Sequence, residues 1–314
     1  MGMYCFGIDV GGTSVKCGLF LTNGTLVEQW EIPTRLENNG SSILPDVADA
    51  IKTKLDERGI TKDNVDGVGI GIPGPVNENG EVPMAVNLHW GFKAVASELS
   101  ALTGLPAKAA NDANIAALGE AWKGAAEGAK NVILVTLGTG VGGGIIIDSK
   151  IIAGYHGAGG EIGHACVNHN EVRPCNCGNH GCLEQYASAT GIVRVAQRTL
   201  AATDEQTVLR KFTKLSAKNV LDAFKEGDKV ACDVMAQVGE MLGGTLAMFA
   251  CVTDPEAIVI GGGVSKAGQP LIDCIQKYYE KYAFTACKKT PIILATLGND
   301  AGIYGSARMV IKEV

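Results

Sequence analysis

Short apolar runs separated by tight turns dominate the start of the chain. Asn23-Gly24, a pair typical of hairpins, separates two of these runs. The runs cover Tyr4 to Val10, Val15 to Leu21 and Thr25 to Ile32. The pattern therefore predicts three strands in an antiparallel meander.

Farther along, single buried strands alternate with segments of helical spacing. We expect strands at 65–72, 131–137, 145–148, 257–260 and 292–297, and helices at 41–59, 93–103, 111–124, 184–200, 217–226, 229–252, 266–283 and 299–312. Alternating strands and helices predict an α/β protein. A strand, a glycine turn and a second strand occur once near each half's start, an echo that predicts two similar domains with a boundary near residues 110–130.

Composition excludes several classes of protein. Apolar residues make up 46% and charged residues 19% of the 314 residues, which is typical of globular chains and not of disordered ones. A net charge of −6 opposes a nucleic-acid or anionic-membrane partner. Ten cysteines without a signal peptide favour a reducing compartment, and no apolar run reaches the ~18 residues of a membrane span. We therefore expect a soluble cytoplasmic protein.

Three glycine loops are candidates for binding a nucleotide. Their residues are Gly11, Gly12 and Thr13 in the first, Gly138, Thr139 and Gly140 in the second, and Gly261, Gly262 and Gly263 in the third. Backbone N–H groups in such turns converge on phosphate oxygens, although each loop alone is also compatible with a plain turn. Asp9 beside the first loop indicates Mg²⁺, and Lys16 would add a positive charge. Together the loops predict a nucleotide held in an interdomain cleft.

Four closely spaced soft ligands predict a structural zinc site. His164, Cys175, Cys177 and Cys182 lie within nineteen residues, and three thiolates with one imidazole complete a zinc tetrahedron. The alternative is a set of ordinary buried cysteines. Further ligand candidates are nearby at Cys166, His169 and His180.

Two carboxylates flank the predicted zinc loop. Glu161 lies three residues before His164, and Glu184 lies two residues after Cys182. A zinc-bound imidazole presents its second N–H as a donor, so these groups together suit a polyhydroxylated ligand such as a sugar. Two solvated glutamates are the competing interpretation.

Asp112 is a candidate general base for phosphoryl transfer to an alcohol. It stands at the start of the expected helix at 111–124, where Asp also serves as a cap. If Asn111 is the cap, the Asp112 carboxylate is available to accept a hydroxyl proton. The residues alone leave cap and base equally open.

Motifs along the whole chain resemble those of the ROK sugar kinases, and most closely the bacterial glucokinases of that family. They are DVGGT at Asp9, GIPGP at Gly71, NLHW at Asn87, NDAN at Asn111, LGTGVGGG at Leu137, EIGH at Glu161, CNCGNHGCLE at Cys175 and GGGVS at Gly261. EIGH together with the Cys-x-Cys-Gly-x-x-Gly-Cys-x-Glu pattern is highly specific. The catalytic, sugar-binding and zinc-binding positions that the resemblance implies show no departure from the family pattern.

The resemblance implies an actin-like ATPase (ribonuclease H-like) fold with two α/β domains, an interdomain cleft and a homodimer. We place the N-terminal domain at residues 1–117 with the helix at about 300–314, and the C-terminal domain at 118–299 with its zinc loop at 164–182. The resemblance makes Asp112 the catalytic base. Zinc ligands are the four named above, and the sugar-binding residues are Asn87, Asn111, Asp112, Glu161, His164 and Glu184.

The resulting hypothesis is ATP-dependent phosphorylation of glucose at its 6-hydroxyl, with ATP, Mg²⁺ and structural Zn²⁺ bound. A kinase for mannose, fructose or N-acetylmannosamine is the closest alternative. A sugar-responsive repressor, a function also found in the family, would need an N-terminal helix-turn-helix, for which the strand expected from Tyr4 leaves no room. A zinc-knuckle nucleic-acid module is opposed by the acidic balance.

Overall fold

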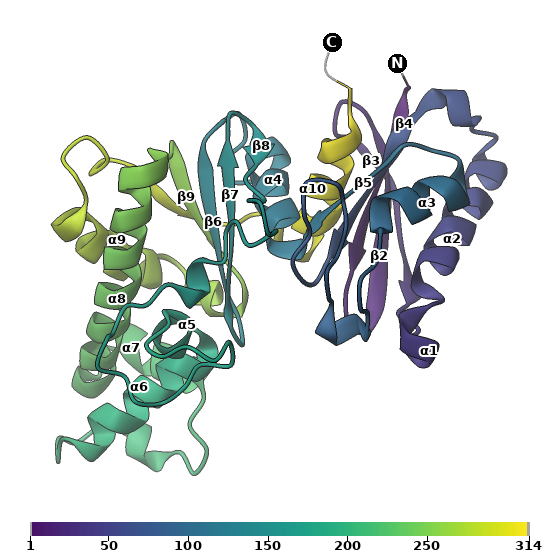
Figure 1. The fold of residues 1–314 in the computed structure, drawn as a ribbon. Helices are drawn as coiled ribbons and strands as arrows, with labels where there is room; N and C mark the ends of the chain where they lie inside the picture. The colour runs from purple at the N-terminus through teal and green to yellow at the C-terminus, as the bar shows by residue number, and fades with distance from the viewer. Residues whose placement is uncertain (1, 313–314) are drawn as a thin grey trace. The chain divides into compact units, whose positions relative to one another are not determined.

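The computed structural model describes residues 2–312 and divides the chain into two compact units (Figure 1). Of the described residues, one unit contains 2–130, 144–160 and 296–312, and the other contains 131–143 and 161–295. The chain therefore passes between the units four times, after residues 130, 143, 160 and 295, and ends in the first unit. The domain boundaries expected from sequence stay a prediction.

The first unit is built on a five-stranded sheet with the order β3-β2-β1-β4-β5. Its strands are β1 (Tyr4–Val10), β2 (Ser14–Leu21), β3 (Leu26–Pro33), β4 (Val65–Ile72) and β5 (Ala107–Asn111). The first three pair antiparallel, as the apolar runs predicted, and β4 and β5 continue the sheet in parallel with β1. Strand β5 was not expected.

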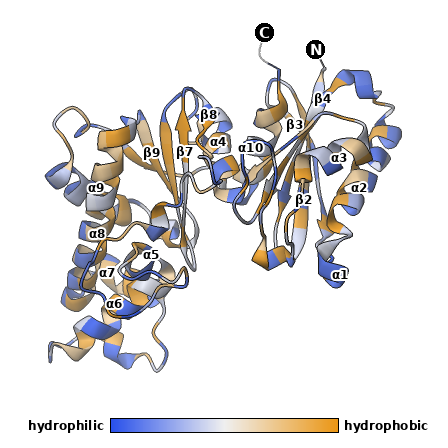
Figure 2. Cartoon of the chain, viewed as in Figure 1, coloured by the Kyte–Doolittle hydropathy of each residue, from blue (hydrophilic) through white to orange (hydrophobic). Residues whose placement is uncertain are grey.

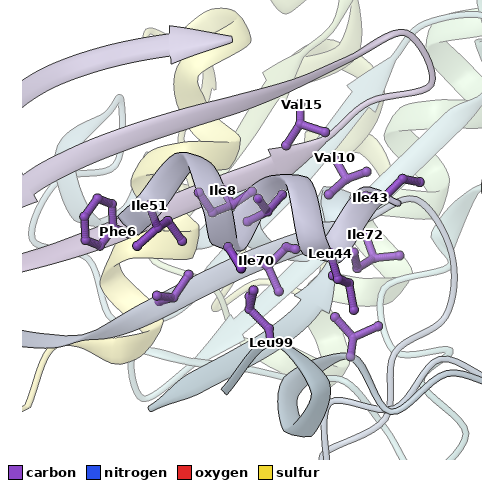
Figure 3. Close-up of a cluster of buried hydrophobic side chains, with 14 of the residues drawn as sticks. Phe6, Ile8, Val10, Val15, Ile43, Leu44, Ile51, Ile70, Ile72 and Leu99 are labelled. Carbon is purple, nitrogen blue, oxygen red and sulfur yellow. The ribbon is translucent and has the colours of Figure 1, made fainter. Parts of the chain in front are cut away.

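Helices cover both faces of this sheet. They are α1 (Glu37–Gly40), α2 (Ile43–Arg58), α3 (Val95–Thr103), α4 (Asp112–Lys123) and α10 (Ala301–Val310). On one face, α2 and α3 bury Ile51 and Leu99 against Phe6, Ile8 and Ile70 of the strands (Figure 3). On the other face, α10 packs against β1 and β4. The sheet is thus the middle layer of three.

The second sheet has the order β10-β9-β6-β7-β8. Its strands are β6 (Val132–Leu137), β7 (Val141–Ile147), β8 (Lys150–Ile151), β9 (Ala257–Gly261) and β10 (Ile292–Leu294). Strands β6, β9 and β10 are parallel. Strand β7 begins directly after the glycine turn instead of at Ile145, because its first residues also extend and pair, and β10 ends three residues earlier than expected.

The helices of the second unit gather around one long core helix. They are α5 (Glu184–Ala187), α6 (Ala189–Ala201), α7 (Ala217–Lys225), α8 (Lys229–Thr253) and α9 (Gln269–Tyr282). Among the helices of residues 2–312, α8 is the one long and apolar enough to cross a membrane, but 56% of its most apolar window is buried within the protein. It packs against α6, α7 and α9, as a core helix does, and hydrophobic colour marks both α8 and the strands of the second sheet (Figure 2).

Candidate active site

The turn between β1 and β2 exposes its backbone. The Gly11 N–H donates to the carbonyl of Ser14 at 3.0 Å, and the Thr34 hydroxyl donates to the carbonyl of Gly11 at 2.7 Å, so the turn is fixed from both sides. A Cβ added at Gly12 would meet no atom within 4 Å. The geometry leaves open space beside the backbone, which is what a phosphate needs to approach N–H groups.

Asp9 and Lys16 lie opposite one another on β1 and β2. The Lys16 ammonium donates to the carbonyl of Asn299 at 3.0 Å and pairs with Asp300 at 3.3 Å, so it is engaged within the unit. Burial and the negative charge of Asp112 raise the pKa of Asp9 to about 6, against the opposing charge of Lys16. Asp9 and Asp112 therefore repel each other, and a bound cation would relieve that repulsion.

Asn111 and Asp112 have different roles at the N-terminus of α4. The Asn111 side-chain oxygen accepts the N–H groups of Ala113 at 2.9 Å and Asn114 at 3.2 Å, so Asn111 is the cap. The Asn111 amide also donates to the carbonyl of Gly74 at 3.1 Å. The Asp112 side chain is exposed, and one of its oxygens accepts the Ala113 N–H at 2.8 Å. A carboxylate at a helix N-terminus is stabilised in its charged form.

Asn87 lies exposed in the 3-10 turn Val86–Leu88. The turn is closed by reciprocal backbone hydrogen bonds of 3.0 Å between Ala85 and Trp90. The Trp90 indole N–H donates to the carbonyl of Gly40 at 3.1 Å, which fixes the base of the turn. Asn87 is thus an exposed amide on a well-supported turn.

In the second unit, two glycine loops follow the carboxyl ends of neighbouring parallel strands. Thr136 of β6 is paired with Gly261 of β9, and an added Cβ at Gly262 would lie 2.6 Å from the carbonyl oxygen of Leu137. Added Cβ atoms at Gly138 and Gly263 would meet nothing within 4 Å. In open α/β sheets, ligands bind at this edge of the strands.

Glu161, His164 and Glu184 lie around the first of these loops. Glu161 precedes the 3-10 turn Ile162–His164, and an added Cβ at Gly163 would lie 2.1 Å from the carbonyl oxygen of Val141. The Glu184 carboxylate accepts the Val141 N–H at 3.1 Å. Glu184 thus contacts the strand that leaves the glycine loop, and Glu161 lies two residues before Gly163, which packs against the same strand.

The four predicted zinc ligands form one cluster. Ligand atoms of His164, Cys175, Cys177 and Cys182 all lie within 4.8 Å of one another. The Cys177 and Cys182 sulfurs are 3.6 Å apart, and the Cys175 sulfur is 3.9 Å from Nδ1 of His164. Zn–S bonds of ~2.3 Å and a Zn–N bond of ~2.0 Å in a tetrahedron require separations of about 3.5–3.8 Å. The residues fit zinc.

The environment of the cluster shifts the pKa values of two of its thiols, those of Cys177 and Cys182. Burial and hydrogen bonding with the neighbouring sulfurs raise the pKa of Cys182 to about 12. Burial also tends to raise the pKa of Cys177, but hydrogen bonds with the Asn179 backbone, Cys182 and Cys175 lower it overall. The thiolate is the form that binds zinc, so the cluster already favours that form at Cys177.

Sequence reasoning missed the acidic residue in the middle of the zinc loop. The Glu171 side chain is 3% exposed and pairs with Arg198 at 2.8 Å. It lies in a polar stretch, Asn-Glu-Val-Arg-Pro, that carries no helix, strand or ligand signal. Its partner is on α6, 27 residues later, and only the fold shows the pairing.

The chain was compared with known proteins. Residues 5–313 match the ROK family. A glucokinase from Halalkalibacterium halodurans is 43% identical over 312 residues, 98% of this chain and 94% of the relative. A ROK family glucokinase from Streptomyces griseus, solved with glucose and AMPPNP, is 33% identical, has a TM-score of 0.71 and matches 98% of both chains. A ROK hexokinase from Thermus thermophilus is 28% identical, with a TM-score of 0.79 over 98% of this chain and 97% of the other.

Two α/β units with glycine loops at their strand ends, and these structural relatives, define a sugar kinase of the actin-like ATPase fold. The chain belongs to the ROK family. Both the family and the fold class expected from the motifs are thereby confirmed.

Proposed function

We propose that the protein transfers the γ-phosphoryl group of ATP to the 6-hydroxyl of glucose, giving glucose 6-phosphate and ADP. The observation that carries this proposal is the 43% identity to a glucokinase over 98% of the chain. The chemistry of each unit agrees with this: the first carries an open glycine loop and the exposed carboxylate of Asp112, and the second carries two glycine loops, the exposed carboxylate of Glu161 and a zinc-binding cluster.

Asp112 is the proposed general base. Its carboxylate accepts the proton of the 6-hydroxyl while the hydroxyl oxygen attacks the γ-phosphorus, and the bond to the β-phosphate oxygen breaks to release ADP. Asn111 supports this role, since it caps α4 and leaves the exposed Asp112 carboxylate at the helix N-terminus. Besides Asp112, the sugar contacts would come from Asn87, Asn111, Glu161, His164 and Glu184.

The nucleotide would lie on the glycine loops. Gly11, Gly12 and Thr13 in one unit, and Gly138 to Gly140 with Gly261 to Gly263 in the other, offer backbone N–H groups to phosphates or ribose. Asp9 is the residue that would hold Mg²⁺, and Lys16 adds a positive charge on the neighbouring strand. Magnesium bound with ATP neutralises charge on the phosphate oxygens.

Zinc would act as a structural ion. A site closed by three thiolates and one imidazole leaves no position for substrate. His164 would bind through Nδ1, which lies 3.9 Å from the Cys175 sulfur, and this leaves its Nε2 N–H to donate to a sugar hydroxyl.

The test is Asp112→Asn in a coupled assay for glucose phosphorylation. We expect kcat to fall by ~10²–10⁴ while the glucose KM changes little, because the amide keeps the shape but accepts no proton. Asp222→Asn, which removes a partly exposed carboxylate of α7 in the other unit, is the control. Near-normal turnover of Asp112→Asn would remove Asp112 as the base.

The sugar itself is tested with the wild-type protein. We expect the largest kcat/KM for glucose when mannose, fructose and N-acetylmannosamine are compared at the same ATP concentration. A larger value for any of the other three would replace glucose as the substrate and leave the reaction class intact.

We also propose that the protein is a cytoplasmic homodimer. Supporting this is an exposed apolar surface at the end of α8 and α9, where Met248, Val252 and Phe284 are 57%, 83% and 64% exposed. Exposed apolar side chains that gather into a patch are typical of interaction sites. Light scattering should give twice the chain mass, and Val252→Glu should halve it. A wild-type monomer would refute the dimer.

A further inference from the structure

Zinc by itself leaves the middle of its loop unsupported. Ten residues separate His164 from Cys175, and the metal would fix only the two ends of that segment. A flexible segment loses conformational entropy when its ends are joined, and that loss opposes metal binding. A second anchor in the middle would lower this penalty before the ion arrives.

Glu171 lies in the middle of this segment and is fully bonded. Arg198 approaches both of its oxygens, with Nη1 at 2.8 Å from Oε2 and Nη2 donating to Oε1 at 2.9 Å. The Tyr186 hydroxyl donates to Oε2 at 2.7 Å, and the Arg173 N–H donates to Oε1 at 3.1 Å. The two carboxylate oxygens thus accept from four donors, and four is the number of hydrogen bonds that a carboxylate can accept.

The partners of Glu171 belong to the elements that carry the site. Tyr186 is in α5, which begins at Glu184, and Arg198 is in α6. The amide of Asn168, between His164 and Glu171 in the segment, donates to the Tyr186 hydroxyl at 2.8 Å. The loop is thus tied to the short helix whose first residue is the proposed sugar-binding carboxylate.

The side-chain amide of Gln185 links this hydrogen-bond network to the zinc ligand Cys182. The buried Gln185 side chain accepts the Cys182 N–H at 3.1 Å and donates to the carbonyl of Arg173 at 2.9 Å. Arg173 is the same residue whose N–H contacts Glu171. A continuous chain of hydrogen bonds therefore runs from the middle of the loop to a zinc ligand.

We propose that Glu171, held by Arg198 and Tyr186, is a positioning residue that pre-forms the zinc-ligand cluster and aligns Glu184 with the sugar. The zinc part of this proposal stands on the cluster alone, and the sugar part rests on the proposed function. Outer partners of a metal site typically contribute 10–100-fold to metal affinity. Loss of Glu171 should therefore weaken zinc binding about 10-fold.

The test compares Glu171→Gln and Tyr186→Phe with Tyr279→Phe in the full-length protein. Tyr279 is the matched control, because its buried hydroxyl also donates one hydrogen bond, to the carbonyl of Cys287 at 2.8 Å, but on α9. Zinc affinity is measured by competition with a chromogenic chelator, and the KM values for glucose and ATP are measured separately.

We expect Glu171→Gln and Tyr186→Phe to lower zinc affinity about 10-fold and to raise the glucose KM while the ATP KM is unchanged. Tyr279→Phe should change none of these. If Glu171→Gln does not fold, Tyr186→Phe decides. Wild-type zinc affinity in the variants would overturn the proposal, even if their melting temperatures fall. If glucose is not a substrate, the zinc measurement still decides the role of Glu171.

Discussion

The substitution Gly140→Ala tests whether Glu184 binds the sugar, because its effect on glucose kinetics can be distinguished from an effect on ATP binding. An added Cβ at Gly140 would lie 2.2 Å from Oε2 of Glu184, the oxygen that accepts the Val141 N–H at 3.1 Å. Carbon and oxygen need about 3.4 Å, so the carboxylate must move by about 1 Å and its hydrogen bond to Val141 is lost. A misplacement of that size costs roughly 10²-fold, or ~2.7 kcal/mol of transition-state stabilisation.

The assay is steady-state kinetics with glucose and ATP varied in turn. For Gly140→Ala we expect kcat/KM for glucose to fall about 10²-fold with little change in the ATP KM. Gly138→Ala is the control in the same loop: its added methyl would meet no protein atom within 4 Å and would instead enter the space proposed for phosphate. It should raise the ATP KM and leave the glucose KM near wild type. An unchanged glucose kcat/KM in Gly140→Ala would refute the placement of Glu184 in the sugar site.

Further predictions concern charge, metal and acid. The folded pKa of Asp9, about 6, lies above the usual 3.8, so Asp9 destabilises the fold as pH rises through that range. In urea titrations at pH 8, Asp9→Asn should therefore raise the free energy of unfolding by up to ~3 kcal/mol, while activity is lost. Equal stability of the two proteins at pH 8 would contradict this. Metal analysis should find one zinc per chain, and Cys177→Ser should raise the glucose KM; a zinc-free protein with full activity would exclude a structural ion. The hydrogen bonds and charge of Arg198 lower the pKa of Glu171 to about 2. With chelator present, the loss of stability in Glu171→Gln should therefore have its full size above about pH 4.5 and should shrink as pH falls towards 2. A loss of stability that does not depend on pH would argue against a charged Glu171.

The features that sequence predicted best are local ones. The zinc cluster was predictable because its ligands lie within nineteen residues and the geometry of a tetrahedron restricts which residue types can close it. The meander and the helix at 111–124 were predictable for a similar reason, since Asn23-Gly24 and the Asn111 cap act on their own neighbours. In each case the determining contacts lie within one short, continuous stretch of the chain.

Non-local features were missed for the opposite reason. Strand β5 consists of Ala-Lys-Ala-Ala-Asn, residues with weak strand preference, and it extends because it pairs with β4 some forty residues earlier. The buried pairing of Glu171 with Arg198 likewise depends on how the zinc loop folds against α6. Nothing in either segment identifies its distant partner.

The glycines of α10 show why propensity alone misjudges the site. A glycine within a helix costs about 1 kcal/mol relative to alanine, so Gly302 would be counted against the helix expected there. An added Cβ at Gly302, however, would lie 2.3 Å from Oδ2 of Asp9, and one at Gly7 of β1 would lie 1.9 Å from the carbonyl of Ile303. These glycines let α10 pack directly on β1, which keeps Asp9 buried beside the first glycine loop and raises its pKa. Glycine lowers the intrinsic stability of α10, but it allows the Asp9 carboxylate to be buried beside the first glycine loop. A bound cation would neutralise the charge of that carboxylate.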